Sequence, residues 1–145
     1  MAFDAGMVAA VAHELKHLLL GGRIDKIYQP EKDEVTLLIR GAHENFRLLI
    51  SAGNRNPRIQ LSYYNKENPQ SAPMFCMLLR KHLSGARIPA IRQPGFERIV
   101  IIECEGRDEM GFFCKRNLIA EIMGKYSNII LTDGDGRIIS AIKTV

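Results

Sequence analysis

The residues most suggestive of chemistry lie near the start of the chain, in the run His13-Glu14-Leu15-Lys16-His17. Two histidines four positions apart on a helix can bind Zn²⁺ together, and the glutamate between them can act as a general base, as in zinc proteases. Helical geometry, however, places both histidines nearly opposite the apolar side formed by Met7, Val11 and Leu15. Lys16 would also repel the ion, and no third ligand stands out downstream. We therefore predict two solvent-exposed histidines and no metal site.

Two glycine-containing motifs favour chain reversals over ligand sites. Asp133-Gly134-Asp135-Gly136 has the carboxylates of a calcium loop, but the glutamate that closes such a loop about nine residues later is missing. Aspartate–glycine pairs between apolar runs are typical of hairpin turns. Gly21-Gly22 lacks the glycine spacing and the lysine of a phosphate-binding loop, so it indicates the end of a helix. We expect no cofactor.

Basic residues are densest around Arg80-Lys81-His82, with Arg87 and Arg92 close behind. Guanidinium groups match the geometry of phosphate oxygens, which makes Arg80, Lys81 and Arg87 candidates for contacts with RNA. The alternative is a solvated helix face without a partner.

An adjacent acid and base, Glu97-Arg98, open the strongly apolar run from Ile99 to Ile102. Neighbouring residues of a strand point to opposite faces, so a shared role for these two side chains requires a bend. Pro94-Gly95, just before the pair, supplies a cause for one. Glu97 and Arg98 are therefore candidate site residues at the end of a strand.

Two helices are expected to help position these residues. The first is capped by Asp4, has Met7, Val11, Leu15 and Leu18 on its apolar side, and ends at Gly21-Gly22. The second covers about residues 74–83, with Ser71 as its cap, Phe75, Leu79 and Leu83 on one side, and Gly85 and Pro89 closing it.

The remaining apolar runs predict strands. These are Ile24 to Tyr28, Val35 to Arg40, Phe46 to Ser51, Ile59 to Tyr63, Arg98 to Cys104, Leu118 to Met123, Ile129 to Thr132 and Arg137 to Ile142. The order of one helix, four strands, a helix and four or five strands lacks the alternation that builds parallel sheets. We predict an α+β fold, a mainly antiparallel β-sandwich with two principal helices, as one domain over residues 1–145. The chain stops directly after an apolar strand, which suggests a fragment of a longer multidomain protein.

Composition is compatible with a cytoplasmic protein. A chain of 145 residues, 46% hydrophobic and 25% charged, can enclose one continuous core. Its net charge of +4 permits an RNA partner without requiring one. The apolar runs are far shorter than the roughly 18 residues of a membrane span, and no signal peptide is visible. Cys76, Cys104 and Cys114 are odd in number and widely spaced, which predicts reduced thiols.

Nearly the whole chain resembles the N-terminal domain of the NFACT family, whose members are ribosome quality-control factors first called fibronectin-binding proteins. The matching segments are Asp4 and Gly6, His13 to Leu15, Gly22 to Pro30, Phe75 to Leu83, Gly85 to Ile88 and Glu121 to Leu131.

The resemblance implies a non-catalytic module. Family members bind the large ribosomal subunit carrying a stalled nascent chain and recruit tRNA, alanyl-tRNA in bacteria, for untemplated C-terminal tailing, while the ribosome performs peptide transfer. The family signature, an acidic residue before the first helix and an Asp-Arg pair, falls here on Asp4 and on Glu97-Arg98. Glutamate stands where aspartate is usual, which moves the carboxylate by about one bond length.

Two alternatives remain open. The older family name suggests a surface adhesin that binds fibronectin, although no export signal or anchor is visible in the sequence. The family domain also resembles the N-terminal domain of formamidopyrimidine-DNA glycosylases, whose nucleophile is an N-terminal proline followed by glutamate. Met1-Ala2-Phe3 supplies neither residue, so that chemistry is not expected here.

Overall fold

The structure is a computed structural model that describes residues 4–144. Its helices are α1 (Ala5–Leu19), α2 (Met74–Leu83) and the short 3₁₀ helix η1 (Gly124–Tyr126). Its strands are β1 (Arg23–Glu31), β2 (Glu34–Arg40), β3 (Asn45–Ser51), β4 (Arg58–Leu61), β5 (Arg87–Arg92), β6 (Ile99–Arg107), β7 (Phe113–Glu121), β8 (Asn128–Asp133) and β9 (Ile138–Ala141).

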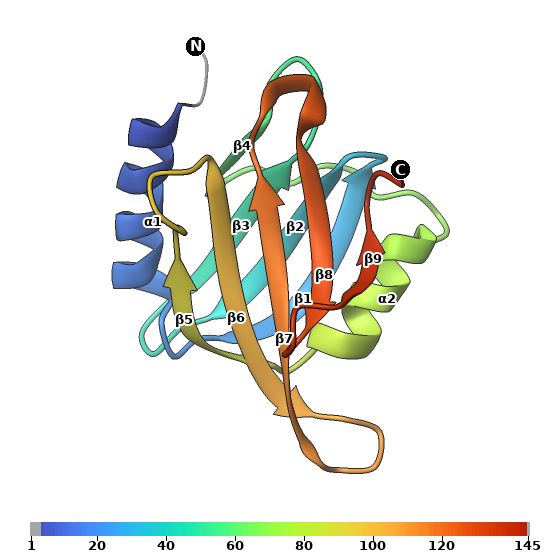
Figure 1. Ribbon diagram of the computed structural model, residues 1–145. Helices are drawn as coiled ribbons and strands as arrows, with labels where there is room; N and C mark the ends of the chain where they lie inside the picture. The colour runs from blue at the N-terminus through green and yellow to red at the C-terminus, as the bar shows by residue number, and fades with distance from the viewer. Residues whose placement is uncertain (1–3, 145) are drawn as a thin grey trace.

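One antiparallel sheet is bent into two layers, with strand order β4-β3-β2-β1-β5-β6-β7-β8-β9. β1 and β5 pair only at Arg23 and Arg87, so the sheet opens there and β1–β4 lie behind β5–β9 (Figure 1). α1 packs beside β5 and α2 beside β1, which closes the two open sides of the sandwich. The α+β class and the mainly antiparallel architecture with two helices are thus confirmed, and one continuous core lies between the layers.

Helix α1 begins as predicted, because the Asp4 carboxylate accepts a hydrogen bond of 2.8 Å from the Met7 backbone N–H. Its buried side is displaced by about one residue from the predicted one and consists of Val8, Ala12, Leu15 and Leu19. Both sets have helical spacing, and contacts with β5 and β4 select the side that docks. Gly21, with a φ of 80°, ends the helical segment.

Helix α2 has the predicted bounds, and Phe75, Leu79 and Leu83 are buried on one side. The prediction that Ser71 caps it was wrong: Pro73 occupies the N-cap position, and no side chain accepts a hydrogen bond there. Proline tolerates this position because its fixed φ is compatible with helix entry. α2 is therefore held by its buried side.

Three strand predictions need correction. β7 runs from Phe113 to Glu121, whereas the predicted strand ran from Leu118 to Met123. The sequence prediction did not include β5, because Gly85 and Pro89 were interpreted only as the end of α2. Proline is tolerated in β5 because β1 pairs with only its first residue, and a register irregularity lies between Arg87 and Ala90. β4 ends at Leu61, so Tyr63 lies beyond the strand and not within it.

No helix in the described part of the chain has the length and hydropathy to cross a bilayer. Cys76 and Cys104 are buried, Cys114 is half-buried, and none of the three forms a disulfide. Burial raises the pKa of Cys104 to about 12, so this thiol stays protonated at neutral pH.

Candidate nucleic-acid interface

The start of α1, the turn between β5 and β6, and the end of β7 meet at one corner of the sandwich (Figure 1). The side-chain amide of Gln93 donates hydrogen bonds to the carbonyl of Ala5, at 3.2 Å, and to the carbonyl of Glu97, at 2.6 Å. The carbonyl of Arg98 accepts a 2.9 Å hydrogen bond from the N–H of Ile122, directly after β7. We call the site formed by Asp4, Gln93, Glu97, Arg98 and Glu121 the Gln93 corner.

The predicted bend beside Glu97-Arg98 is present. Gly95 adopts a φ of 58°, which is costly for other residues, and β6 begins only at Ile99. Glu97 and Arg98 therefore lie in a bend before the strand, where the alternation of strand faces does not apply. Both side chains are exposed.

The corner offers both donors and acceptors to a ligand. Among residues 4–144, no carboxylate lies within 4.0 Å of the Arg98 guanidinium, so its donors are available. Asp4 and Glu97 are exposed and Glu121 is half-buried. Carboxylates accept hydrogen bonds from nucleobase N–H groups, and a guanidinium donates to phosphate or to a guanine edge. Phe96, 70% exposed on the same turn, adds an apolar surface on which a base can stack.

The predicted basic region does not form a single open patch. Arg80 and Lys81 lie on α2, whereas Arg87 and Arg92 lie at opposite ends of β5, about 17 Å apart along the strand. Arg80 donates a 2.9 Å hydrogen bond from Nε to the carbonyl of Ile27 and so joins α2 to β1.

Carboxylates neutralise most of the other cations in this region. The pairs are Lys81 with Glu109 at 3.4 Å, Arg87 with Glu105 at 2.6 Å and Arg92 with Glu103 at 3.1 Å. Basic residues that are close together in the sequence therefore do not form a concentrated positive surface on the folded protein.

Sequence interpretation assigned no role to Gln93, Phe96 or Glu121. A lone glutamine before Pro94 gives no sequence signal, because its function depends on two carbonyls brought together by folding. Glu121 belongs to a segment that resembles the family, but its position beside the start of β6, opposite Ile99, follows only from strand register.

Burial raises the pKa of Glu121 above its usual value of 4.5. The folded protein then binds this proton more tightly than the unfolded chain does, so the stability from Glu121 is fully present below pH of about 4.5 and is lost as pH rises through the raised pKa. We expect Glu121→Gln to gain melting temperature relative to wild type as pH rises from about 4 to about 7. Thermal melts across this range check the sign, and a relative loss would contradict it.

The histidines of the H-E-x-x-H run are both exposed, as predicted. No three His, Cys, Asp or Glu side chains within residues 4–144 converge as metal ligands. We expect purified protein to contain far less than one zinc per chain. Elemental analysis checks this, with His13→Ala compared against His43→Ala, a loop histidine, as control. One zinc per chain that His13→Ala alone removes would refute the prediction.

The Asp133–Gly136 motif is a turn, as predicted. The Asp133 carboxylate accepts hydrogen bonds of 2.9 Å from the N–H groups of Asp135 and Arg137, so it is occupied by the backbone of its own turn.

Comparison with known proteins places these features in a family. Residues 4–145 match the family described as NFACT N-terminal and middle domains. The chain belongs to the NFACT family. It is 45% identical over 139 residues to the Rqc2 homologue RqcH of Bacillus subtilis, an alignment that covers 96% of the chain and 24% of that relative. It is 33% identical over 143 residues to the ribosome quality control complex subunit NEMF of Mus musculus, covering 97% of the chain and 12% of NEMF.

Solved structures of similar proteins share the fold. The N-terminal domain of the fibronectin-binding protein PavA from Streptococcus pneumoniae superimposes with a TM-score of 0.96 at 42% identity, covering 99% of this chain and 55% of that one. The fibrinogen-binding protein from Staphylococcus aureus gives a TM-score of 0.90 at 36% identity, covering all of this chain and 52% of that one. The chain spans about a quarter of the length of the RqcH relatives that it matches.

Proposed function

We propose that this chain is a non-catalytic tRNA- and ribosome-binding module, and that the Gln93 corner contacts tRNA. The observation that carries the proposal is Arg98: an exposed guanidinium without a carboxylate partner in the described residues, on a bend that Gln93 ties to α1. The hydrogen bonds of Gln93 fix the backbone that carries this guanidinium, which lowers the entropic cost of a contact with an anionic or nucleobase partner. Asp4, Glu97 and Glu121 supply carboxylate acceptors on the segments that meet at this corner.

For the whole protein we propose a cytoplasmic ribosome quality-control factor, in which this chain forms one domain. The protein would recruit alanyl-tRNA to large subunits that carry a stalled nascent chain, for C-terminal tailing that the ribosome itself catalyses. The names of the RqcH and NEMF relatives support quality control on the ribosome. Arg80, Lys81 and Arg87 remain proposed as additional phosphate contacts, reached when RNA competes with Ile27, Glu109 and Glu105 for them.

A second candidate is a fibronectin-binding adhesin, which the name of the PavA structure favours. A third, a glycosylase-like enzyme, rests on the expected likeness to formamidopyrimidine-DNA glycosylases. It has less support, because Met1-Ala2-Phe3 contains neither the proline nor the glutamate of that chemistry, and these residues lie outside the described part of the structure.

Gradient sedimentation of the native full-length protein separates the candidates. We expect it to co-sediment with large ribosomal subunits and to bring tRNA with it, and to bind immobilised fibronectin no better than a basic control protein does. Recovery in the cell-wall fraction with specific fibronectin binding and no tRNA would instead establish the adhesin.

A further inference from the structure

The layer formed by β1–β4 has one side packed against the core and one side facing solvent. The solvent-facing side carries a groove. Thr36, Leu38, Arg47 and Leu49 point to this face, because they alternate with core residues of β2 and β3. Two clefts of about 300 and about 370 Å³ lie here, and they share Leu38, Arg47 and Ser62. We call this continuous depression the outer groove.

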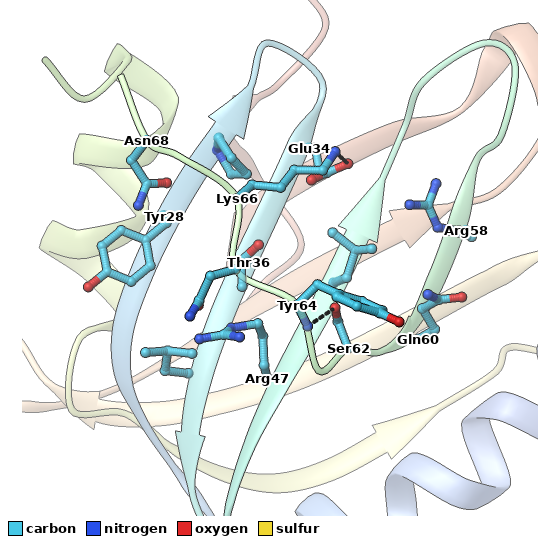
Figure 2. Close-up of a pocket in the computed structure, with 14 residues that line it drawn as sticks. Tyr28, Glu34, Thr36, Arg47, Arg58, Gln60, Ser62, Tyr64, Lys66 and Asn68 are labelled. Carbon is cyan, nitrogen blue, oxygen red and sulfur yellow. Dashed lines mark hydrogen bonds and ion pairs between the residues drawn. The ribbon is translucent and has the colours of Figure 1, made fainter. Parts of the chain in front are cut away.

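A defined segment, residues 62–68, crosses the outer groove on its way from β4 to α2 (Figure 2). The N–H of Ser62 donates to the carbonyl of Arg47 at 2.8 Å, and the N–H of Tyr64 donates to the Ser62 hydroxyl at 3.3 Å. Further along, the Lys66 ammonium donates to the buried carboxylate of Glu34 at 3.1 Å. The segment is thus tied to the sheet at both ends.

This segment presents two large aromatic side chains to solvent. Tyr63 is 90% exposed and lines one cleft, whereas Tyr64 is 84% exposed and lines the other. Exposed neighbouring rings add little to the stability of the domain, yet each offers a flat face of the kind on which nucleobases stack.

Two arginines in the groove have no carboxylate partner in the described part of the chain, unlike Arg87 and Arg92 of β5. Arg47 lines both clefts and Arg58 lines one, and among the described residues no carboxylate lies within 4.0 Å of either guanidinium. Lys66 and Arg40 are already paired, with Glu34 and Asp25 respectively. Within residues 4–144, the positive charge without a carboxylate partner therefore lies at Arg47, which lines both clefts, and at Arg58, while Glu44 adds an unpaired negative charge to the cleft of Tyr63.

We propose that the outer groove binds a short stretch of single-stranded RNA, with successive bases stacked on Tyr63 and Tyr64 and the phosphate between them on Arg47. Each cleft lies near the lower end of small-ligand pocket sizes, about 300 to 1,000 Å³, which suits a single nucleotide. A duplex keeps its bases stacked on one another and cannot place them on the tyrosines. An acidic peptide without aromatic residues would satisfy Arg47 and Arg58 but has no rings to stack on the two tyrosines. This site goes beyond the Gln93 corner and does not depend on it.

The test measures fluorescence anisotropy of a labelled single-stranded RNA heptamer with the 145-residue chain at low salt. Tyr64→Ala should weaken binding by about five- to a hundredfold, the loss expected for one stacked base, while Tyr64→Phe retains most of the affinity. Arg47→Ala should weaken binding and flatten the plot of log affinity against log salt by up to about one unit. Phe112→Ala and Arg137→Ala, on hairpins elsewhere, serve as matched aromatic and cationic controls.

Each outcome decides the proposal, provided melting curves confirm folding. Tyr64 lies on an exposed segment, so its variant tests the groove even if Arg47→Ala unfolds. The site is supported if only the groove variants lose affinity for the heptamer. The wild-type chain should also bind a duplex of the same sequence more weakly than the single strand. Equal losses in Phe112→Ala or Arg137→Ala, competition by polyglutamate as strong as by RNA, or no measurable wild-type binding would overturn it. A double variant separates the two sites: Tyr64→Ala should weaken heptamer binding by the same factor in the Arg98→Ala background as in wild type, whatever Arg98 itself contributes.

Discussion

Arg98→Ala in the full-length protein reduces tRNA co-purification by about five- to a hundredfold. This range corresponds to the roughly 1 to 3 kcal/mol that a charge-assisted hydrogen bond or a bidentate base contact contributes. The melting temperature should change little, because Arg98 is exposed and no carboxylate among residues 4–144 lies within 4.0 Å of it. Quantitative tRNA recovery and thermal melts on the same preparations measure both effects.

Arg137→Ala is the matched control, since this exposed arginine lies in the turn between β8 and β9. Glu97→Ala should cost less than Arg98→Ala if Glu97 only orients the arginine, and as much if its carboxylate accepts from a nucleobase. Asp4→Ala is a less specific probe, because it also removes the cap of α1, worth about 1 kcal/mol. Wild-type tRNA recovery together with a lowered melting temperature in Arg98→Ala would mean a purely structural role and would remove the corner from the binding surface.

Leu15→Ala lowers the free energy of unfolding by about 2 to 5 kcal/mol, the range for truncating a buried leucine. Leu15 is fully buried, with 0% of its surface exposed, where α1 closes one side of the sandwich. The loss combines the missing apolar contact with the cavity left behind. Urea denaturation at constant pH gives the difference directly.

Leu20→Ala provides the comparison, because Leu20 is also a leucine, lies directly after α1 and is 48% exposed. We expect it to change the unfolding free energy by less than about 1 kcal/mol. Similar losses for the two leucines would mean that α1 does not dock by the side observed here. Helix α1 also carries Asp4 to the Gln93 corner. Molecules of Leu15→Ala that remain folded keep α1 docked, so we expect tRNA recovery to fall only in proportion to the fraction unfolded.

Short-range sequence patterns predicted the structure correctly wherever the decisive interaction joins residues only a few positions apart. The Asp4 cap, the bounds of α2, the Asp133–Gly136 turn and the solvent-facing histidines all follow from hydrogen bonds or periodicity inside one element. Segment resemblance added the family, which composition and spacing alone do not reveal.

Tertiary structure decided what depends on neighbours distant in sequence. Two sides of α1 had helical spacing, and packing against β5 selected the one centred on Val8, Ala12 and Leu15. β5 became a strand despite Pro89 because β6 supplies its hydrogen bonds. Charge density along residues 80–92 was divided between α2 and β5 and largely neutralised by acids that the sequence places elsewhere. The Gln93 corner and the outer groove exist only because segments up to 88 residues apart meet, a proximity that short-range periodicity does not contain.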